Sequence, residues 1–382
     1  MRTKTTFSTI IIVAALTGLF SYGYSRIGRN GPEVKCEGEE KQIVSCWDKA
    51  IANVLKKKGL ELAFSQFSQL YDQEPLFQKN CHDFTHRLGR GAYELFSEGK
   101  FFRVSPKTQY CSFGFYHGFM ETLVAKSQDF KKAREFCAYV DQQLREESPN
   151  ASGACFHGIG HGWASIHEKI SPGDEKKIVE PALNLCEKVS ETDDQIFRCA
   201  TGVFDSIAIA YYNKLYGLEM KKENPLWLCQ EQPDYYKLPC YRELMTAVIR
   251  LADNDLKQAI PYVSKFVETP YRAISVRVLA DASVRFLEKK TGPEESIAIC
   301  HSLEDLSRQS CIRGLSDGVI QHGPPGEEYK GAIAFCKSSL LSSEEKDLCF
   351  RAAIGYFSQI YSPAKFKKTC DMVEKEYKKL CR

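Results

Sequence analysis

The sequence lacks an excess of charge of either sign. Its 382 residues include 52 Lys and Arg and 49 Asp and Glu, which gives a formal net charge of +3. A protein that binds a nucleic-acid backbone needs a concentrated basic surface, whereas these charges are interspersed along the chain. We therefore expect no nucleic-acid partner.

The short motifs of several cofactor sites are also missing. The chain contains no Walker loop, no C-x2-C-H haem attachment and no C-x2-C pair of any kind. The first two absences exclude a P-loop nucleotide site and a c-type haem. The third disfavours zinc held by paired thiolates.

Long apolar runs are absent beyond the N-terminus, so no later segment is predicted to span a membrane. The chain begins with a basic stretch that precedes an apolar run over residues 7–20. This pattern predicts a signal peptide or an uncleaved membrane anchor within residues 1–32, and both alternatives stay open. We expect a single domain over residues 33–382, exported to a periplasm or outside the cell, with any membrane attachment confined to the N-terminal segment.

Cysteine, by contrast, is abundant: there are sixteen. An even number in an exported chain predicts disulfides, because thiols pair in an oxidising compartment. Six of the eight intervals between successive neighbours span 10 to 13 residues, as expected when the end of one helix is tied to the start of the next. The predicted pairs are Cys36–Cys46, Cys81–Cys111, Cys137–Cys155, Cys186–Cys199, Cys229–Cys240, Cys300–Cys311, Cys336–Cys349 and Cys370–Cys381.

An internal repeat accompanies the cysteines. The segments that begin at Cys111, Cys155, Cys199 and Cys311 all read C-x2-G-x2-[HD]-[GS] and continue with apolar residues at helical spacing. A shorter helix is predicted before each first cysteine. The 71-residue gap between Cys240 and Cys311 predicts a cysteine-free hairpin, with its two helices near residues 259–263 and 271–276.

The predicted fold is therefore all-α, a solenoid-like array of disulfide-stapled two-helix repeats. Second cysteines recur every 41 to 44 residues from Cys111 to Cys240, within the range of two-helix solenoid units. In unit length and helix pairing the array resembles secreted cysteine-rich relatives of the tetratricopeptide-type repeat proteins. The likeness concerns architecture only, so it implies no functional residue.

Six of the eight histidines lie in a His-rich part at about residues 81–168. Imidazoles one helical turn apart can bind one Zn, Cu or Fe ion, and repeat-equivalent positions should lie side by side on adjacent helices. The predicted ligands of a one- or two-metal site are His82, His86, His117, Glu121, His157 and His161. A b-type haem would use the same residues. Alternatively, the repeat position needs only a polar side chain, since Asp205 occupies it in the next unit.

Two functions fit these patterns. The first is an exported protein that binds a transition metal and could be a metal-dependent enzyme, with Glu121 or Asp83 as its base. The second is a non-catalytic helical-repeat scaffold whose groove binds a protein or peptide. Four tyrosines either line that groove or pack between units: Tyr211, Tyr212, Tyr235 and Tyr236. Glycines such as Gly158 and Gly202 predict close approach of helices or of a ligand.

Overall fold

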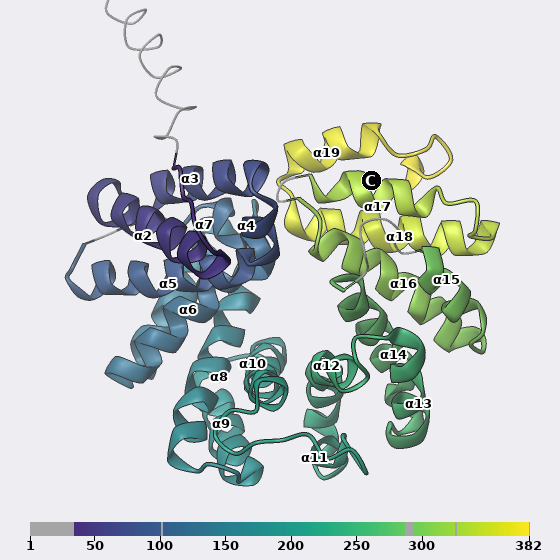
Figure 1. Cartoon of the computed structure of the whole chain (residues 1–382), viewed down its shortest axis with the longest axis horizontal. Coiled ribbons are helices and arrows are strands. Elements are labelled where there is room, and N and C mark those ends of the chain that lie inside the picture. Colours follow the sequence, from purple (N-terminus) through teal and green to yellow (C-terminus); the bar gives the residue numbers. More distant parts are fainter. Residues whose placement is uncertain (1–33, 101, 287–293, 325–326, 382) are drawn as a thin grey trace, which may run out of the picture.

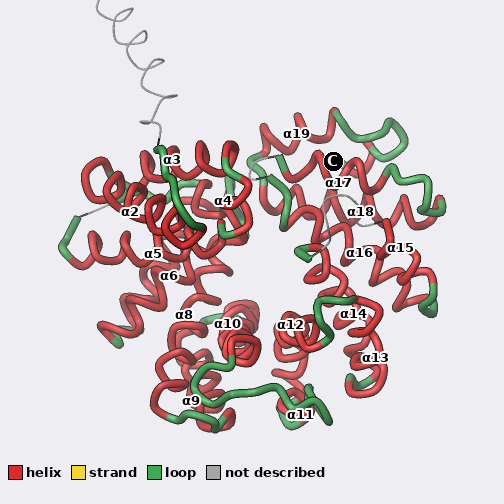
Figure 2. Tube along the Cα trace, viewed as in Figure 1, coloured by secondary structure: helices red, strands yellow, loops and turns green. Residues whose placement is uncertain are grey.

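A computed structural model describes residues 34–100, 102–286, 294–324 and 327–381. Within these ranges the chain is helical and contains no strand (Figure 2). The predicted signal peptide or anchor at residues 1–32 lies outside the described residues. In the described part, no helix combines the length and the apolar character that crossing a bilayer requires.

The helices form two layers, as predicted for an array of two-helix units. The inner layer consists of helices that contact one another in chain order. They are α5 (Cys81–Ser97), α6 (Tyr110–Ser127), α8 (Ala151–Ile170), α10 (Asp193–Asn213), α12 (Asp234–Leu251), α14 (Thr269–Val284), α16 (Asp305–Gln321) and α18 (Ser343–Ile360).

Shorter helices cover the outside of this layer. In the middle of the array they are α7 (Phe130–Leu144), α9 (Glu175–Val189), α11 (Trp227–Gln230), α13 (Leu256–Phe266), α15 (Glu294–His301) and α17 (Glu328–Cys336). The ends are built by α2 (Glu40–Lys58), α3 (Leu60–Gln73), α4 (Pro75–Lys79), α19 (Pro363–Asp371) and the single turns η1 (Pro106–Gln109) and η2 (Lys378–Leu380). The cysteine-free hairpin predicted between Cys240 and Cys311 is confirmed as α13 and α14.

Local signals explain why individual helices form, and α10 is an example. The side chain of Thr192 accepts a hydrogen bond from the backbone N–H of Gln195, which caps the first turn. Val203 and Ile207, one turn apart, are fully buried against the neighbouring helices. The core lies between the two layers, where the rings of Phe119 and Phe136 stack at 4.1 Å.

All sixteen cysteines form eight disulfides with the predicted partners, and the paired Cα atoms are 5.4 to 6.0 Å apart. Five pairs staple an outer helix to the next inner helix, as expected. The other three pairs differ from that expectation: Cys36–Cys46 and Cys370–Cys381 fasten the chain ends, and Cys81–Cys111 joins the starts of two inner helices, α5 and α6. Eight disulfides are typical of a protein that folds in an oxidising compartment, as exported proteins do.

Repeat glycines set the spacing of the inner helices. A Cβ on Gly202 of α10 would collide with the carbonyl oxygen of His157 on α8, and a Cβ on Gly160 of α8 would collide with that of Cys199 on α10. A Cβ on Gly158 would likewise press on α6. The prediction that these glycines mark close approach is confirmed, and the contact is between helix backbones.

The array bends until its two ends meet (Figure 1). The hydroxyl of Tyr71 on α3 donates to the carbonyl oxygen of Gly323, just after α16, at 3.3 Å. The side-chain amide of Asn150 likewise donates to Gln359 of α18 at 3.3 Å. These contacts join residues more than 200 positions apart in the sequence.

Candidate metal centre

Four successive inner helices bring histidines and carboxylates together in two groups. The first triad is His86 of α5 with Glu121 of α6 and His161 of α8. The second triad is His117 of α6 with His157 of α8 and Asp205 of α10. Within each triad, one ligand atom from every residue lies within 4.8 Å of the others. Each group therefore offers two imidazoles and one carboxylate.

The triads divide the residues differently from the one-turn pairs seen in the sequence. His157 and His161 lie one turn apart on α8 but belong to different triads, and so do His117 and Glu121 on α6. The reason is helix spacing: where glycines bring the backbones together, side chains of neighbouring helices come closer than partners along one helix. The rings of His117 and His157 stack across the helix boundary with centroids 4.6 Å apart.

His82 lies beside the triads and belongs to neither. Its ring is 5.2 Å from that of His117, and its Nδ1 donates to the carbonyl oxygen of Cys111 at 2.8 Å. That carbonyl is placed by an unusual turn, because residues 111 to 113 all have φ values between 52° and 60°. Left-handed conformations are costly for residues other than glycine and recur near functional sites.

Hydrogen bonds determine the tautomer of His157 in the second triad. The hydroxyl of Thr201 donates to the carbonyl oxygen of Arg198 at 2.6 Å, so it can only accept from Nδ1 of His157, which is 2.9 Å away. In neutral His157 the proton is then on Nδ1 and Nε2 carries a lone pair. That nitrogen faces Oδ2 of Asp205 at 3.4 Å. Two acceptors that face each other are stabilised by a cation between them.

The first triad contains polar atoms without partners. Among the described residues, Nδ1 of His161 and Oε2 of Glu121 are buried and form no hydrogen bond. Leaving a buried polar atom unpaired costs about 1–3 kcal/mol. The Nε2 atom of His86 lies 3.4 Å from the same Glu121 oxygen. Each residue of the triad therefore offers one atom to an ion placed between them.

Electrostatics keep the histidines ready to coordinate. Burial, together with the nearby His161, lowers the pKa of His86 to about 2. Burial also lowers the pKa of His117 and of His161. These imidazoles are neutral at neutral pH. A metal ion therefore does not have to displace a second ring proton before it binds. Burial raises the pKa of Asp205, but a hydrogen bond from His157 and the charge of protonated imidazoles nearby outweigh burial and lower that pKa.

Known proteins do not identify this centre. No protein-family model, curated protein or solved structure matches the chain. The chemistry of the site has to be inferred from its own geometry.

Two residues near the triads were not among the predicted site residues. Asp205 is a member of the second triad, although in the sequence it stood out only as the aspartate that replaces histidine in the repeat. Glu168, on α8, accepts a hydrogen bond from Ser206 at 2.6 Å, and burial raises its pKa to about 7. No sequence signal pointed to Glu168, because its burial depends on the packing of α8 against α10.

The remaining histidines and the second candidate base lie outside the triads. His167 donates to the carbonyl oxygen of Trp163 at 3.0 Å, and His301 contacts a glutamate of α18 at 3.1 Å. His322 ends α16, where it is exposed. Asp83 is exposed on α5 and is not a member of either triad, whereas the other predicted base, Glu121, is.

The four tyrosines considered for a peptide groove have different surroundings. Tyr211 and Tyr236 are buried, and their hydroxyls donate to glutamates of α9 at 3.2 and 2.6 Å. Tyr212 stacks under the guanidinium of Arg250 at 4.9 Å. Tyr235 is 49% exposed at the surface. Tyr211 therefore packs against the outer helix of its own unit, and Tyr236 packs against that of the preceding unit.

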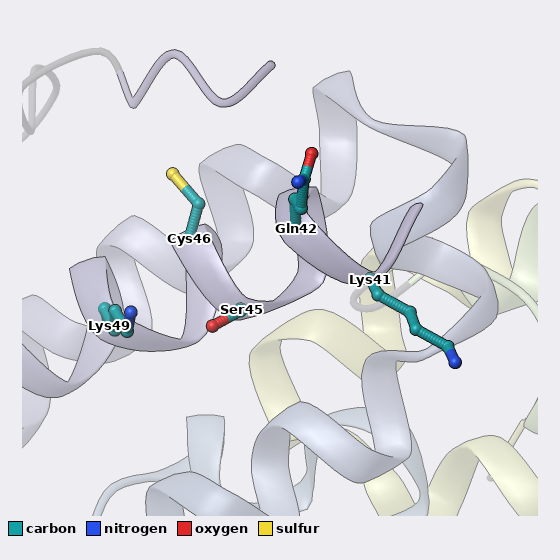
Figure 3. Close-up of a pocket in the computed structure, with 5 residues that line it drawn as sticks. All are labelled: Lys41, Gln42, Ser45, Cys46 and Lys49. Atoms are coloured by element: carbon teal, nitrogen blue, oxygen red, sulfur yellow. The ribbon is translucent and has the colours of Figure 1, made fainter. Parts of the chain in front are cut away.

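Two other features carry no site. Residues 314–318 spell G-x-S-x-G, but they lie inside the continuous helix α16 and Ser316 is fully buried, so they do not form the exposed turn of a nucleophile elbow. The surface depression in Figure 3 lies on α2 and contains neither histidine nor carboxylate. Its lining residues are Lys41, Gln42, Ser45, Cys46 and Lys49.

Proposed function

We propose that this protein is an exported metal-binding protein that holds a transition-metal ion in the second triad, between His117, His157 and Asp205. The observation that carries the proposal is the pair of opposed acceptors at 3.4 Å, Nε2 of His157 and Oδ2 of Asp205. Without a cation, this arrangement needs a second proton on His157. A metal ion between the two atoms makes that second proton unnecessary. It would bind Nε2 of a ring whose other nitrogen, Nδ1, is already held by Thr201.

The anchoring is the arrangement that metal-binding histidines normally have. Such a histidine donates its other ring N–H to a nearby acceptor, which fixes both its tautomer and its orientation. His157 does so through Thr201, which is in turn fixed by its bond to a backbone carbonyl. His117 completes the triad with a buried, neutral ring. The second triad is therefore prepared for coordination before any ion arrives.

Two imidazoles and one carboxylate favour a borderline or moderately hard ion. Zn, Fe and Cu all accept this combination, and Mg and Ca prefer oxygen ligands. Three protein ligands also leave at least one coordination position for water or a substrate, which catalytic sites require and closed structural sites lack.

The test is metal analysis of the full-length oxidised protein, purified without a histidine tag. Samples are incubated separately with Zn, Cu and Fe, desalted and measured by elemental analysis. We expect about one tightly held ion per chain, with X-ray absorption showing nitrogen and oxygen ligands at about 2.0–2.2 Å. Replacing His157 with Ala and Asp205 with Asn together should remove that ion while the far-ultraviolet circular dichroism stays helical.

His167→Gln is the matched control, because His167 lies on α8 but outside both triads. It should bind metal as the wild type does. Less than about a tenth of an ion per chain for all three metals would reject the proposal. Equal loss in the control and in the double variant would show that general damage to α8 is responsible.

A further inference from the structure

The first triad differs from the second in where its histidine carries a proton. Arg90 donates from a guanidinium N–H to Nδ1 of His86 at 2.8 Å. A guanidinium has no acceptor, so Nδ1 must carry the lone pair. In neutral His86 the proton is therefore on Nε2, the nitrogen that faces Glu121.

This proton is on Nε2, the atom that would coordinate an ion, but it forms no hydrogen bond with Glu121. Nε2 of His86 is 3.4 Å from Oε2 of Glu121, and that oxygen forms no hydrogen bond. Nδ1 of His161 is also buried and unpaired. The first triad thus contains buried atoms that lack hydrogen-bond partners and are suited to bind a metal ion. The hydrogen bond from Arg90 holds His86 in the tautomer that blocks coordination.

The two triads are direct neighbours. The rings of His117 and His161, one from each triad, are nearly parallel with centroids 5.5 Å apart, and the rings of His86 and His117 are 6.1 Å apart. An ion in one triad therefore acts electrostatically on the other at short range in a poorly hydrated environment. Binding in the two places cannot be independent.

We propose that the first triad binds a second metal ion after the second triad is filled, and that Arg90 sets this order. This inference rests on the proposed function, because it requires the first ion. Filling the first triad moves the proton of His86 from Nε2 to Nδ1 and breaks the bond from Arg90, whereas His157 needs no such change. Repulsion from the first ion adds to the difference. Arg90 is a positioning residue, since it acts through His86 and does not itself coordinate.

The experiment is a calorimetric titration of Zn into the chelator-treated, full-length oxidised protein. The wild type should show two steps of about one ion each, the second weaker. His86→Gln should remove the second step and keep the first. Arg90→Gln frees Nδ1 of His86 and should strengthen the second step at least about tenfold, as expected from losing a charge-assisted hydrogen bond that competes with coordination.

Arg87→Gln is the matched control. Arg87 lies on the same helix and carries the same charge, but it pairs with Asp48 at 3.8 Å instead of bonding to His86. It should alter the second step much less than Arg90→Gln does. A single step in both the wild type and Arg90→Gln, or equal effects of the two arginine variants, would overturn the inference. Absence of any binding, in the wild type and in His86→Gln alike, would instead reject the proposed function on which it rests.

Discussion

The imidazole of His157 presents Nε2 to Oδ2 of Asp205 at 3.4 Å, across the boundary between α8 and α10. Its other nitrogen donates to Thr201. The pair is held by helices that almost touch, since a Cβ on Gly202 would collide with the backbone of His157 itself. One close helix contact therefore fixes both the position and the tautomer of the histidine that we place at the centre of the metal site.

Thr201→Val tests the anchoring of His157. The change keeps the shape of the side chain and removes the acceptor for Nδ1–H, so the preferred tautomer and ring orientation are lost. We expect metal affinity to fall about 10–100-fold with little change in fold. Thr122→Val is the control, because the hydroxyl of Thr122 bonds only to a backbone carbonyl of its own helix. Competition with a calibrated chelator measures both, and unchanged affinity in Thr201→Val would contradict the anchoring role.

Gly202→Ala tests the close contact between helices. The added methyl group meets a backbone carbonyl, which cannot move aside as a flexible side chain can, so α8 and α10 must separate. We expect the free energy of unfolding to fall by about 1–3 kcal/mol. Gly355→Ala on α18 meets nothing within 4 Å and should instead stabilise by up to about 1 kcal/mol through helix propensity. Denaturant melts of the two variants should therefore shift in opposite directions.

The apoprotein should lose stability as pH falls below about 6.5, the ordinary pKa of histidine. Burial lowers the pKa of His86 to about 2 and also lowers that of His117. The unfolded chain then binds protons that the folded chain does not, so the free energy of unfolding decreases toward acid pH. Glu168 has the opposite effect, because its pKa is raised to about 7 and its contribution is lost as pH rises.

The difference between wild type and His86→Gln isolates the histidine contribution, because Glu168 is present in both. Thermal melts of chelator-treated samples between pH 7 and 5 should show a shallower acid decline in His86→Gln. Parallel curves for the two proteins would show that His86 does not titrate differently in the folded and unfolded states.

The Cys81–Cys111 disulfide should matter for both stability and metal binding. It joins the start of α5, which carries a residue of the first triad, to the start of α6, which carries a residue of each triad. Replacing both cysteines with Ala should lower the free energy of unfolding by about 2–4 kcal/mol and also weaken metal binding. Removing Cys300–Cys311 in the same way should lower stability by a similar amount but leave metal affinity unchanged. Equal affinities in the two variants would show that α5 and α6 are held in register without their disulfide.

The helices and the disulfide partners could be predicted from the sequence because both depend on short stretches of chain. Apolar spacing after Cys199 and Cys311 predicted inner helices, and α10 and α16 are those helices. Short intervals predicted partners, since a hairpin brings residues 10 to 13 positions apart into reach. The role of Cys81–Cys111 could not be predicted in this way, because its 30-residue interval spans a whole helix and joins two members of the same layer.

The histidine cluster was visible in the sequence, but its division into triads was not. Spacing along one helix suggested that His157 and His161 act together, whereas the structure assigns them to different groups. Asp205 belongs to the second triad although it is 48 residues from its partner His157 in the chain. A one-dimensional pattern reports neighbours along a helix, and the distance between helices depends on how closely their backbones can pack.

The sequence by itself therefore determined an all-helical, disulfide-stapled array with imidazoles gathered in its first half. Only the tertiary structure decided which imidazole nitrogen faces which carboxylate and which buried polar atoms lack a hydrogen-bond partner. It also decided that Arg90 donates a hydrogen bond to Nδ1 of His86. The physical reason is range. Helices and hairpin disulfides arise from interactions within a few turns of chain, while coordination geometry depends on contacts of a few ångströms between helices that only the packed array brings together.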